Sequence, residues 1–408
     1  MDNASGLPVS LADIEAAAER LKGEIVATPT TPAAALLPLV GTSLHLKLET
    51  LQRTGSFKER GALNTLKSLS PTEAKRGVIA ASAGNHAQGL AYHGTRLGIP
   101  VTIVMPAQTP FVKVEKTEGY GAKIVLEGED FMAAEAEASR LSQESGATLV
   151  HPYDDARVIA GQGTIGLEML AAQPALDTVI VPIGGGGLIG GIATAIKNLR
   201  PDIRVVGVQV ESFAGMKSVI EGRAAPTGGT TLAEGIAVKS PGHLTRQLVA
   251  AYVDEIVTVT EPLIERAIQT LAERQNLVAE GAGASGLAAI LADNARWKGR
   301  QIGMVVTGGN VDARVLSSIL MRGLVRDGRL IRIRAELGDR PGTLALFTQV
   351  VAAASGNIVE VVHQRMFLDV SVKNTEIDVV IETRSRSHVA ELIAKLIASG
   401  FPTRLLDA

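Results

Sequence analysis

The chain has 408 residues, too long for one ordinary hydrophobic core, so the sequence predicts two or three domains. Hydrophobic residues make up 46% of the chain and charged residues 20%, as in globular proteins. The formal net charge is −2, from 40 basic and 42 acidic residues, which argues against a nucleic acid or an anionic membrane as partner. The absence of cysteine excludes disulfides, thiolate zinc sites and cysteine nucleophiles.

The sequence contains no recognisable secretion or membrane signal. No basic segment followed by an apolar run stands near its start, and no stretch approaches the roughly 18 apolar residues of a membrane-spanning helix. We therefore expect a cytoplasmic protein without membrane contact.

Residues 10–27 are predicted to form an amphipathic helix. Ser10 can cap its first turn, with Asp13 three residues later as in a capping box. The apolar stripe of this helix consists of Ile14, Ala17, Leu21 and Ile25. Thr28 and Pro29 are predicted to end it, because the residue before a proline disfavours the helical conformation.

From residue 44 onward, short apolar runs alternate with helical patterns. The predicted strands are 44–48, 78–81, 101–104, 123–126, 178–181 and 205–210. The predicted helices between them are 58–69, 86–97, 110–119 and 130–145. This alternation predicts an α/β fold with a mostly parallel sheet covered on both faces.

The first predicted strand leads through a polar turn to a lysine. The stretch reads Ser56-Phe57-Lys58-Glu59-Arg60-Gly61-Ala62. Lys58 stands where a helix is predicted to begin, and the partial positive charge of a helix N-terminus should lower its pKa. A neutral amine is what a lysine needs to form an imine with an aldehyde. A solvated surface lysine in a turn fits the local pattern equally well.

A second turn follows the strand at 78–81 and opens the next helix. Its small residues allow backbone N–H groups to approach an anion, and a helix N-terminus attracts a carboxylate. The candidate carboxylate site consists of Ser82, Ala83, Gly84, Asn85 and His86. An ordinary capped turn, with a solvated His86, is the alternative.

Four glycines follow the strand at 178–181. Gly184, Gly185, Gly186 and Gly187 can turn successive N–H groups onto one phosphate. Residues 184–190 also satisfy the dinucleotide fingerprint, and Glu211 follows the next predicted strand, about where a ribose-binding acid would lie. By itself this region supports an NAD-dependent oxidoreductase as well as any other phosphate-binding enzyme.

The lysine stretch resembles that of the fold-type-II pyridoxal-phosphate enzymes, most closely their threonine dehydratase and serine racemase branch. The two glycine-containing turns fit the same family in the same order. So do three later stretches, which are 231–237, 280–286 and 301–312. An NAD enzyme has no need of Lys58 or Asn85, so the resemblance favours pyridoxal phosphate.

The resemblance implies a role for each of these residues. Lys58 would hold pyridoxal 5′-phosphate as an imine and later remove the Cα proton. The carboxylate turn would hold the substrate, and the other cofactor contacts would be Phe57, Asn85, Gly184, Gly185, Gly186, Gly187, Gly235, Glu280 and Thr307. Glu280 could instead be an ordinary acid in the first turn of a helix.

The implied activity is that of an L-threonine ammonia-lyase, with L-serine as a secondary substrate. Thr307 offers the ring nitrogen a neutral hydroxyl, which suits β-elimination better than transamination. Ala83 stands where the racemases carry an acid/base serine, which makes racemisation doubtful. Serine or hydroxyaspartate dehydration, an NAD oxidoreductase and a non-catalytic amino-acid sensor remain as alternatives.

No divalent metal site is predicted. The racemase-like members hold a cation near the position of Glu211, but Lys217 stands where its second carboxylate would be. A lysine cannot ligate a hard cation and would repel it. Its ammonium could take the place of the ion.

The last 80 residues change pattern. They predict the order βαββαβ of a ferredoxin-like fold, with strands 331–337, 357–366, 376–383 and 403–406. In the first helix, Leu344, Phe347, Val350 and Val351 would share one face. Asp339-x-Pro341-Gly342 and Gly356-Asn357-Ile358 resemble an ACT domain, an amino-acid-binding module, and its candidate effector residues are Gly342, Thr343, Asn357 and Ile358. A plain packing or dimerisation domain is the alternative.

The resemblance also implies a domain plan. A small domain of about 55–153 would be inserted in a large domain formed by 1–54 and 154–325, and 330–408 would be the ACT domain. Isoleucine or valine would be the effector, and the assembly a homodimer or homotetramer.

Overall fold

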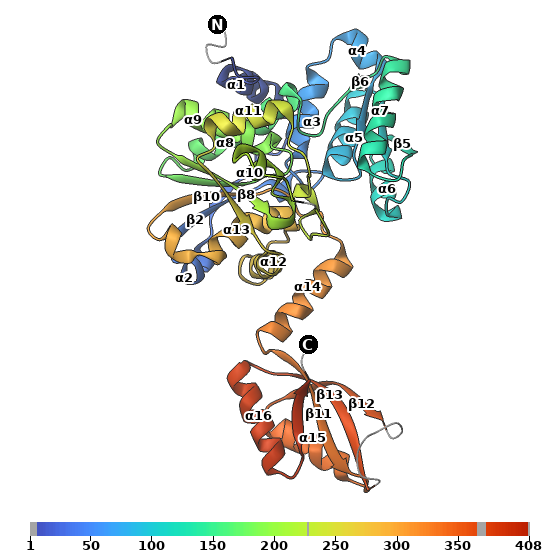
Figure 1. Ribbon diagram of the computed structural model, residues 1–408, viewed down its shortest axis with the longest axis vertical. Helices are drawn as coiled ribbons and strands as arrows, with labels where there is room; N and C mark the ends of the chain where they lie inside the picture. Colours follow the sequence, from blue (N-terminus) through green and yellow to red (C-terminus); the bar gives the residue numbers. More distant parts are fainter. Residues whose placement is uncertain (1–5, 227, 365–372, 407–408) are drawn as a thin grey trace. The chain divides into compact units, whose positions relative to one another are not determined.

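The computed structural model describes residues 6–226, 228–364 and 373–406. The chain divides into two compact units, 1–311 and 312–408 (Figure 1). In the described ranges, no helix is both long enough and apolar enough to cross a membrane.

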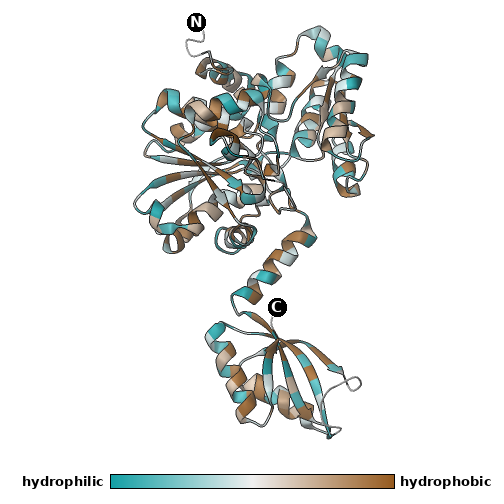
Figure 2. Cartoon of the chain, in the orientation of Figure 1, coloured by the Kyte–Doolittle hydropathy of each residue, from teal (hydrophilic) through white to brown (hydrophobic). Residues whose placement is uncertain are grey.

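The first unit contains a six-stranded sheet of order β1-β2-β10-β7-β8-β9. β1 runs antiparallel to β2, and all other neighbours are parallel. In Figure 2 the central strands are largely hydrophobic, as expected of strands buried on both faces. The strands are β1 (Thr30–Pro32), β2 (Ser43–Leu48), β10 (Gln301–Val306), β7 (Thr178–Pro182), β8 (Arg204–Val210) and β9 (Glu255–Val259).

A second, four-stranded sheet of order β5-β4-β3-β6 is parallel throughout. Its strands are β3 (Val78–Ala81), β4 (Val101–Met105), β5 (Lys123–Leu126) and β6 (Thr148–Leu149). The prediction of mostly parallel strands is confirmed, and these strands belong to two sheets with separate hydrophobic cores.

Helices connect the strands of both sheets. The four predicted helices are confirmed to within two residues at each end, as α3 (Lys58–Lys67), α5 (Asn85–Leu97), α6 (Phe111–Glu118) and α7 (Phe131–Ser145). The further helices of this unit are α2 (Leu37–Val40), α4 (Pro71–Arg76), α8 (Ala156–Ala172), α9 (Gly187–Leu199), α10 (Gly215–Ile220), α11 (His243–Tyr252), α12 (Glu261–Gln275) and α13 (Gly281–Ala292).

The first helix is shorter than predicted. The capping box of Ser10 and Asp13 is confirmed, but α1 (Leu11–Leu21) ends six residues before residue 27. Gly23 has φ +73°, a left-handed conformation that ends the helix. The side-chain amide of Gln52 then binds both the N–H and the carbonyl of Val26, so this segment is held as an extended strap.

The second unit begins with α14 (Ala313–Arg326), which Asp312 caps. The order βαββαβ is confirmed, and the antiparallel sheet has the order β12-β13-β11-β14. The predicted end of the second strand at Met366 lies outside the described residues. Its elements are β11 (Leu330–Gly338), α15 (Thr343–Ala353), β12 (Asn357–Gln364), β13 (Asn374–Glu382), α16 (Arg386–Ala398) and β14 (Thr403–Leu406).

The core of this unit lies between the sheet and its two helices. Phe347 and Val351 of α15 are fully buried against strand residues such as Ile333 and Ile377. Leu344, which was predicted on the same face, is 37% exposed, so that prediction is wrong. It belongs to the first turn of the helix, ahead of the buried stripe.

Candidate active site

Three neighbouring strands of the large sheet deliver three of the predicted motifs. β2, β10 and β7 lead at their carboxyl ends to the lysine turn, to Thr307 and to the glycine turn. Ligands of parallel sheets bind at this edge. The carboxylate turn follows β3 of the smaller sheet in the same way.

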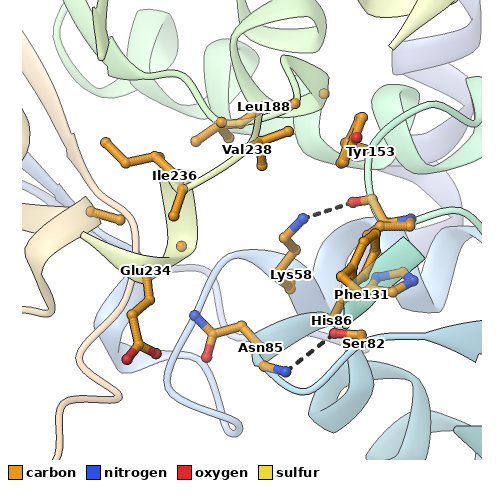
Figure 3. Close-up of a pocket in the computed structure, with 18 of the residues that line it drawn as sticks. Lys58, Ser82, Asn85, His86, Phe131, Tyr153, Leu188, Glu234, Ile236 and Val238 are labelled. Carbon is orange, nitrogen blue, oxygen red and sulfur yellow. Dashed lines mark hydrogen bonds between the residues drawn. The ribbon is translucent and has the colours of Figure 1, made fainter. Parts of the chain in front are cut away.

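All of these motifs line one cavity of about 590 Å³. Every predicted cofactor and carboxylate residue belongs to its wall: Phe57, Lys58, Ser82, Ala83, Gly84, Asn85, His86, Gly184, Gly185, Gly186, Gly187, Gly235, Glu280 and Thr307. Figure 3 shows the lysine, the carboxylate turn and the opposing segment around Ile236. Residues far apart in sequence therefore meet at one site.

The backbone of the lysine turn is bound to the loop after β10. Gly55 has φ +76°, and its carbonyl accepts the N–H of Gly309 at 3.0 Å. The N–H of Phe57 donates to the carbonyl of Thr307, also at 3.0 Å. These bonds fix the start of α3, and with it the Cα of Lys58.

The arginine two residues after Lys58 anchors α3 from behind. Arg60 is fully buried and binds Glu49 through two bonds of 2.8 Å. It also binds Glu168 of α8 at 2.6 and 2.8 Å. Lys47 of β2 completes this buried cluster with a 2.5 Å bond to Glu168. The cluster ties the lysine helix to the large sheet.

The neighbouring residues of the motif are equally constrained. Glu59 is fully buried, accepts the N–H of Thr54 and lies 3.1 Å from Nε2 of His93. A Cβ on Gly61 would lie only 2.4 Å from the side chain of Gln162, so the close packing of α3 on α8 requires glycine there. The residues flanking Lys58 thus have structural roles.

Lys58 points into the cavity (Figure 3). Its Nζ donates to the carbonyl of Pro152 at 2.7 Å and lies 5.2 Å from the centre of the Phe57 ring. The surrounding protein lowers the pKa of its ammonium to about 8, while the charge of Glu280 opposes the shift. The prediction of a lowered pKa is confirmed, but burial is its main cause rather than the helix N-terminus. The solvated-lysine alternative is wrong.

Asn85 and Glu280 meet across the cavity. Nδ2 of Asn85 lies 3.0 and 3.1 Å from the two carboxyl oxygens of Glu280. Burial raises the pKa of Glu280 to about 7, with a smaller contribution from the charge of Glu234, and the hydrogen bonds from Asn85 oppose this rise. Glu280 precedes α13 but makes no capping bond to it, so it is more than an ordinary first-turn acid.

His86 is buried rather than solvated, which corrects the alternative considered for it. Its Nε2 lies 3.3 Å from the carbonyl of Val150, and it is 2% exposed. Burial lowers its pKa to about 3, aided by the nearby charge of Lys58, so the ring is neutral at pH 7. Its Nδ1 has no partner in the described part of the chain.

The glycine turn forms a cradle that larger residues would fill. A Cβ on Gly185 would lie 2.2 Å from the ring of Tyr153. Gly186 has φ +98° and begins α9, so the helix N-terminus opens toward the cavity. The hydroxyl of Thr245 donates to the carbonyl of Gly185 at 2.6 Å and holds the turn in place. Such a turn suits a phosphate group.

Thr307 offers an unsatisfied polar atom to the same cavity. The residue is only 2% exposed, and its Oγ1 has no hydrogen-bond partner among the described residues. Buried hydroxyls normally have a partner. The glycine cradle at one end of the cavity and this free hydroxyl in its wall fit a ligand with a phosphate and a ring nitrogen, as pyridoxal phosphate has.

Sequence patterns missed several residues of the site. Pro152 and Tyr153 come from the segment between β6 and α8, which carries no recognisable motif. Asn310 donates to Oδ1 of Asn85 at 2.8 Å, although it stands in a stretch that was predicted for Thr307 alone. The N-terminal end of α7 supplies further wall residues, namely Asp130, Phe131, Met132 and Glu135.

Glu211 lies outside the cavity wall and is exposed, so it has no place in a nucleotide site there. Lys217 does not replace a cation beside it, because its Nζ donates to the carbonyl of Ile256 at 2.8 Å. Within the residues that the structure describes, no group of three or more His, Asp or Glu side chains could hold a metal ion.

Comparison with known proteins identifies the family. Residues 21–308 match the family model described as "Pyridoxal-phosphate dependent enzyme". The chain belongs to this family. The L-threonine ammonia-lyase of Thermotoga maritima is 45% identical over 400 residues, which cover 98% of this chain and 100% of that protein. The NAD alternative is therefore not supported.

Two solved structures are similar to the first three quarters of this family member. A bacterial threonine deaminase, from the organism abbreviated T.th., is 39% identical, with a TM-score of 0.70, and the match covers 74% of this chain and 99% of that one. Maize serine racemase is 34% identical, with a TM-score of 0.73, and the match covers 78% and 99%. Shape alone thus does not separate lyase from racemase.

The four candidate effector residues lie in the second unit. Gly342 has φ +90° and precedes α15, which begins at Thr343. Asn357 starts β12 and donates to Glu382 at 3.1 Å, and Ile358 is half-buried. A cavity of about 420 Å³ in this unit is lined by other residues, which are Leu346, Gln349, Val350, Ala353, Ser399 and Phe401.

Proposed function

We propose that the chain is an L-threonine ammonia-lyase, which converts L-threonine to 2-oxobutanoate and ammonia. The similarity to the Thermotoga maritima enzyme carries this proposal, because it spans both proteins from end to end. The cavity supports it, since a lysine of lowered pKa faces a phosphate cradle and a carboxylate turn. L-Serine is the secondary substrate.

Each wall residue has a part in the proposed reaction. Pyridoxal phosphate, when bound, withdraws electrons from the substrate and makes its Cα proton acidic. Lys58 binds the cofactor covalently and then, as a free amine, takes that proton. The turn from Ser82 to His86 holds the substrate carboxylate through its N–H groups. Neutral His86 adds no positive charge to that turn.

Further wall residues orient the cofactor. Gly184 to Gly187 bind its phosphate, Phe57 and Gly235 flank its ring, and Asn85 and Glu280 face its ring hydroxyl. Thr307 donates to or accepts from the ring nitrogen without a formal charge. A neutral partner limits how long negative charge can rest on the ring, which favours rapid loss of the β-hydroxyl.

Racemisation is the second candidate, because maize serine racemase is similar in fold. Ala83 lines the cavity and carries no proton to deliver to the substrate. We therefore expect elimination to dominate.

The test is keto-acid release from L-threonine and L-serine by the purified protein. We expect 2-oxobutanoate from threonine faster than pyruvate from serine, with no D-amino acid formed. Lys58→Ala should abolish both activities. Inertness toward both substrates, in a protein that binds the cofactor, would point to another β-substituted amino acid. Faster formation of D-serine than of pyruvate would favour the racemase.

We further propose the domain plan and regulation implied by the sequence. The strands of the small sheet all lie between residues 78 and 149, which supports a small domain inserted in a larger one. The βαββαβ order of the C-terminal unit supports an ACT domain that binds isoleucine or valine. A homodimer or homotetramer would be the assembly, which light scattering after size-exclusion chromatography would reveal.

A further inference from the structure

Asn310 lies between two groups that have opposite hydrogen-bonding character. Its Oδ1 accepts from Nζ of Lys116 at 2.7 Å, and its Nδ2 donates to the carbonyl of Thr54 at 2.7 Å. An ammonium can only donate and a carbonyl can only accept. The side-chain amide of Asn310 therefore has only one satisfactory orientation.

This orientation passes to the next amide. Nδ2 of Asn310 also donates to Oδ1 of Asn85 at 2.8 Å. Because the oxygen of Asn85 is taken up on this side, its NH₂ group must face the other side, where the carboxyl group of Glu280 lies 3.0 Å away. A reversed Asn85 would place its oxygen against the carboxyl oxygens and its NH₂ against another NH₂.

The packing around Asn310 is built for this contact. A Cβ on Gly55 would lie 2.9 Å from Oδ1 of Asn310, so the glycine leaves room for the amide beside the lysine turn. Lys116 belongs to α6, which follows a strand of the smaller sheet, whereas Asn310 follows β10 of the larger sheet. The hydrogen-bonded chain from Lys116 to Glu280 therefore joins the two sheets at the cavity wall.

We propose that Asn310 is a positioning residue of the cofactor site: held between the carbonyl of Thr54 and the ammonium of Lys116, it fixes Asn85 so that its NH₂ group faces Glu280 in the cavity wall. Asn85 then serves the cofactor as a hydrogen-bond donor only. This inference rests on the cofactor site and is independent of which amino acid is the substrate.

Two variants of this chain of bonds test the proposal. Asn310→Asp keeps the shape but sets an acceptor against the oxygen of Asn85, so we expect the affinity of the apoprotein for pyridoxal 5′-phosphate to fall roughly tenfold or more. Lys116→Met removes the donor and keeps the Thr54 contact, so a loss of about two- to fivefold is expected. Lys116→Arg should restore most of it.

A third variant separates position from charge. Lys113→Met removes a positive charge one turn earlier on α6, where Lys113 pairs with the exposed Glu234 at 2.6 Å. We expect it to leave the cofactor affinity within about twofold of wild type. A loss as large as that of Lys116→Met would show that the charge of α6, and not the link to Asn310, is responsible, and would overturn the proposal.

A second readout needs neither cofactor nor activity. In apoprotein labelled with ¹⁵N at asparagine, the NH₂ signals of Asn85 should shift as Glu280 titrates, because they donate to its carboxyl group. The signals should lose this pH dependence in Asn310→Asp and keep it in Lys113→Met. Unchanged signals and unchanged cofactor affinity in Asn310→Asp would refute the proposal, whatever the substrate proves to be.

Discussion

Burial shifts two ionisable residues of the cavity in opposite directions. It lowers the pKa of Lys58 to about 8 and raises that of Glu280 to about 7, because both charged forms lose hydration. Each residue holds the other back, since the negative charge of Glu280 favours the ammonium form of Lys58. Displaced values of this kind are typical of groups that exchange protons near neutral pH.

The lowered pKa of Lys58 makes cofactor uptake depend on pH. Only the neutral amine reacts with the aldehyde of pyridoxal phosphate, so the uptake rate of the apoprotein should rise with pH and level off above about 8. Rapid-mixing absorbance measurements between pH 6 and 10 would show this. Glu280→Gln should move the midpoint to lower pH, because the charge that stabilises the ammonium is gone. A rate that still rises at pH 10 would mean an ordinary lysine.

At the scale of elements, α3 is the part that the local sequence explains best. Its start at Lys58, the motif around it and the glycine turn before α9 could be predicted, because glycines and helix starts are local features. The end of α1 was missed because its apolar pattern continues beyond Gly23. Tyr153 and Lys116 could not be found, since only tertiary packing brings their segments to the cavity and to Asn310.

The buried charges behind α3 predict a large effect on stability. Arg60→Leu would leave Glu49 without its charged partner in the interior, so the free energy of unfolding should fall by about 3–5 kcal/mol. Urea denaturation of the apoprotein at pH 7 measures this loss. Arg140→Ala, which breaks only exposed pairs on α7, is the control and should change stability little. Equal effects of the two variants would contradict a structural role for the cluster.

At the scale of the whole molecule, the chain combines a catalytic unit with a smaller α+β unit. The parallel and antiparallel sheets could both be predicted from the sequence, because fully apolar strands differ from alternating ones. In β11, Ile331, Ile333 and Ala335 are buried while Arg332 is exposed, as the alternation indicated. The ligand of this unit does not follow from its pattern, since the same fold serves many purposes.

Calorimetry of the full-length protein with L-isoleucine and L-valine tests the second unit. We expect saturable binding of one of them, weakened about tenfold or more in Asn357→Ala, because that side chain stands at the start of β12. Asn198→Ala, on α9 of the first unit, is the control and should bind normally. No heat from either amino acid would favour a packing or dimerisation domain.

The most direct test of the central claim is to find which lysine carries the cofactor. Borohydride reduces an imine to a stable secondary amine, so the reduced holoenzyme can be digested and its peptides examined by mass spectrometry. The account predicts a pyridoxyl phosphate group on Lys58 alone. A label on Lys116, on Lys113 or on no lysine would contradict it.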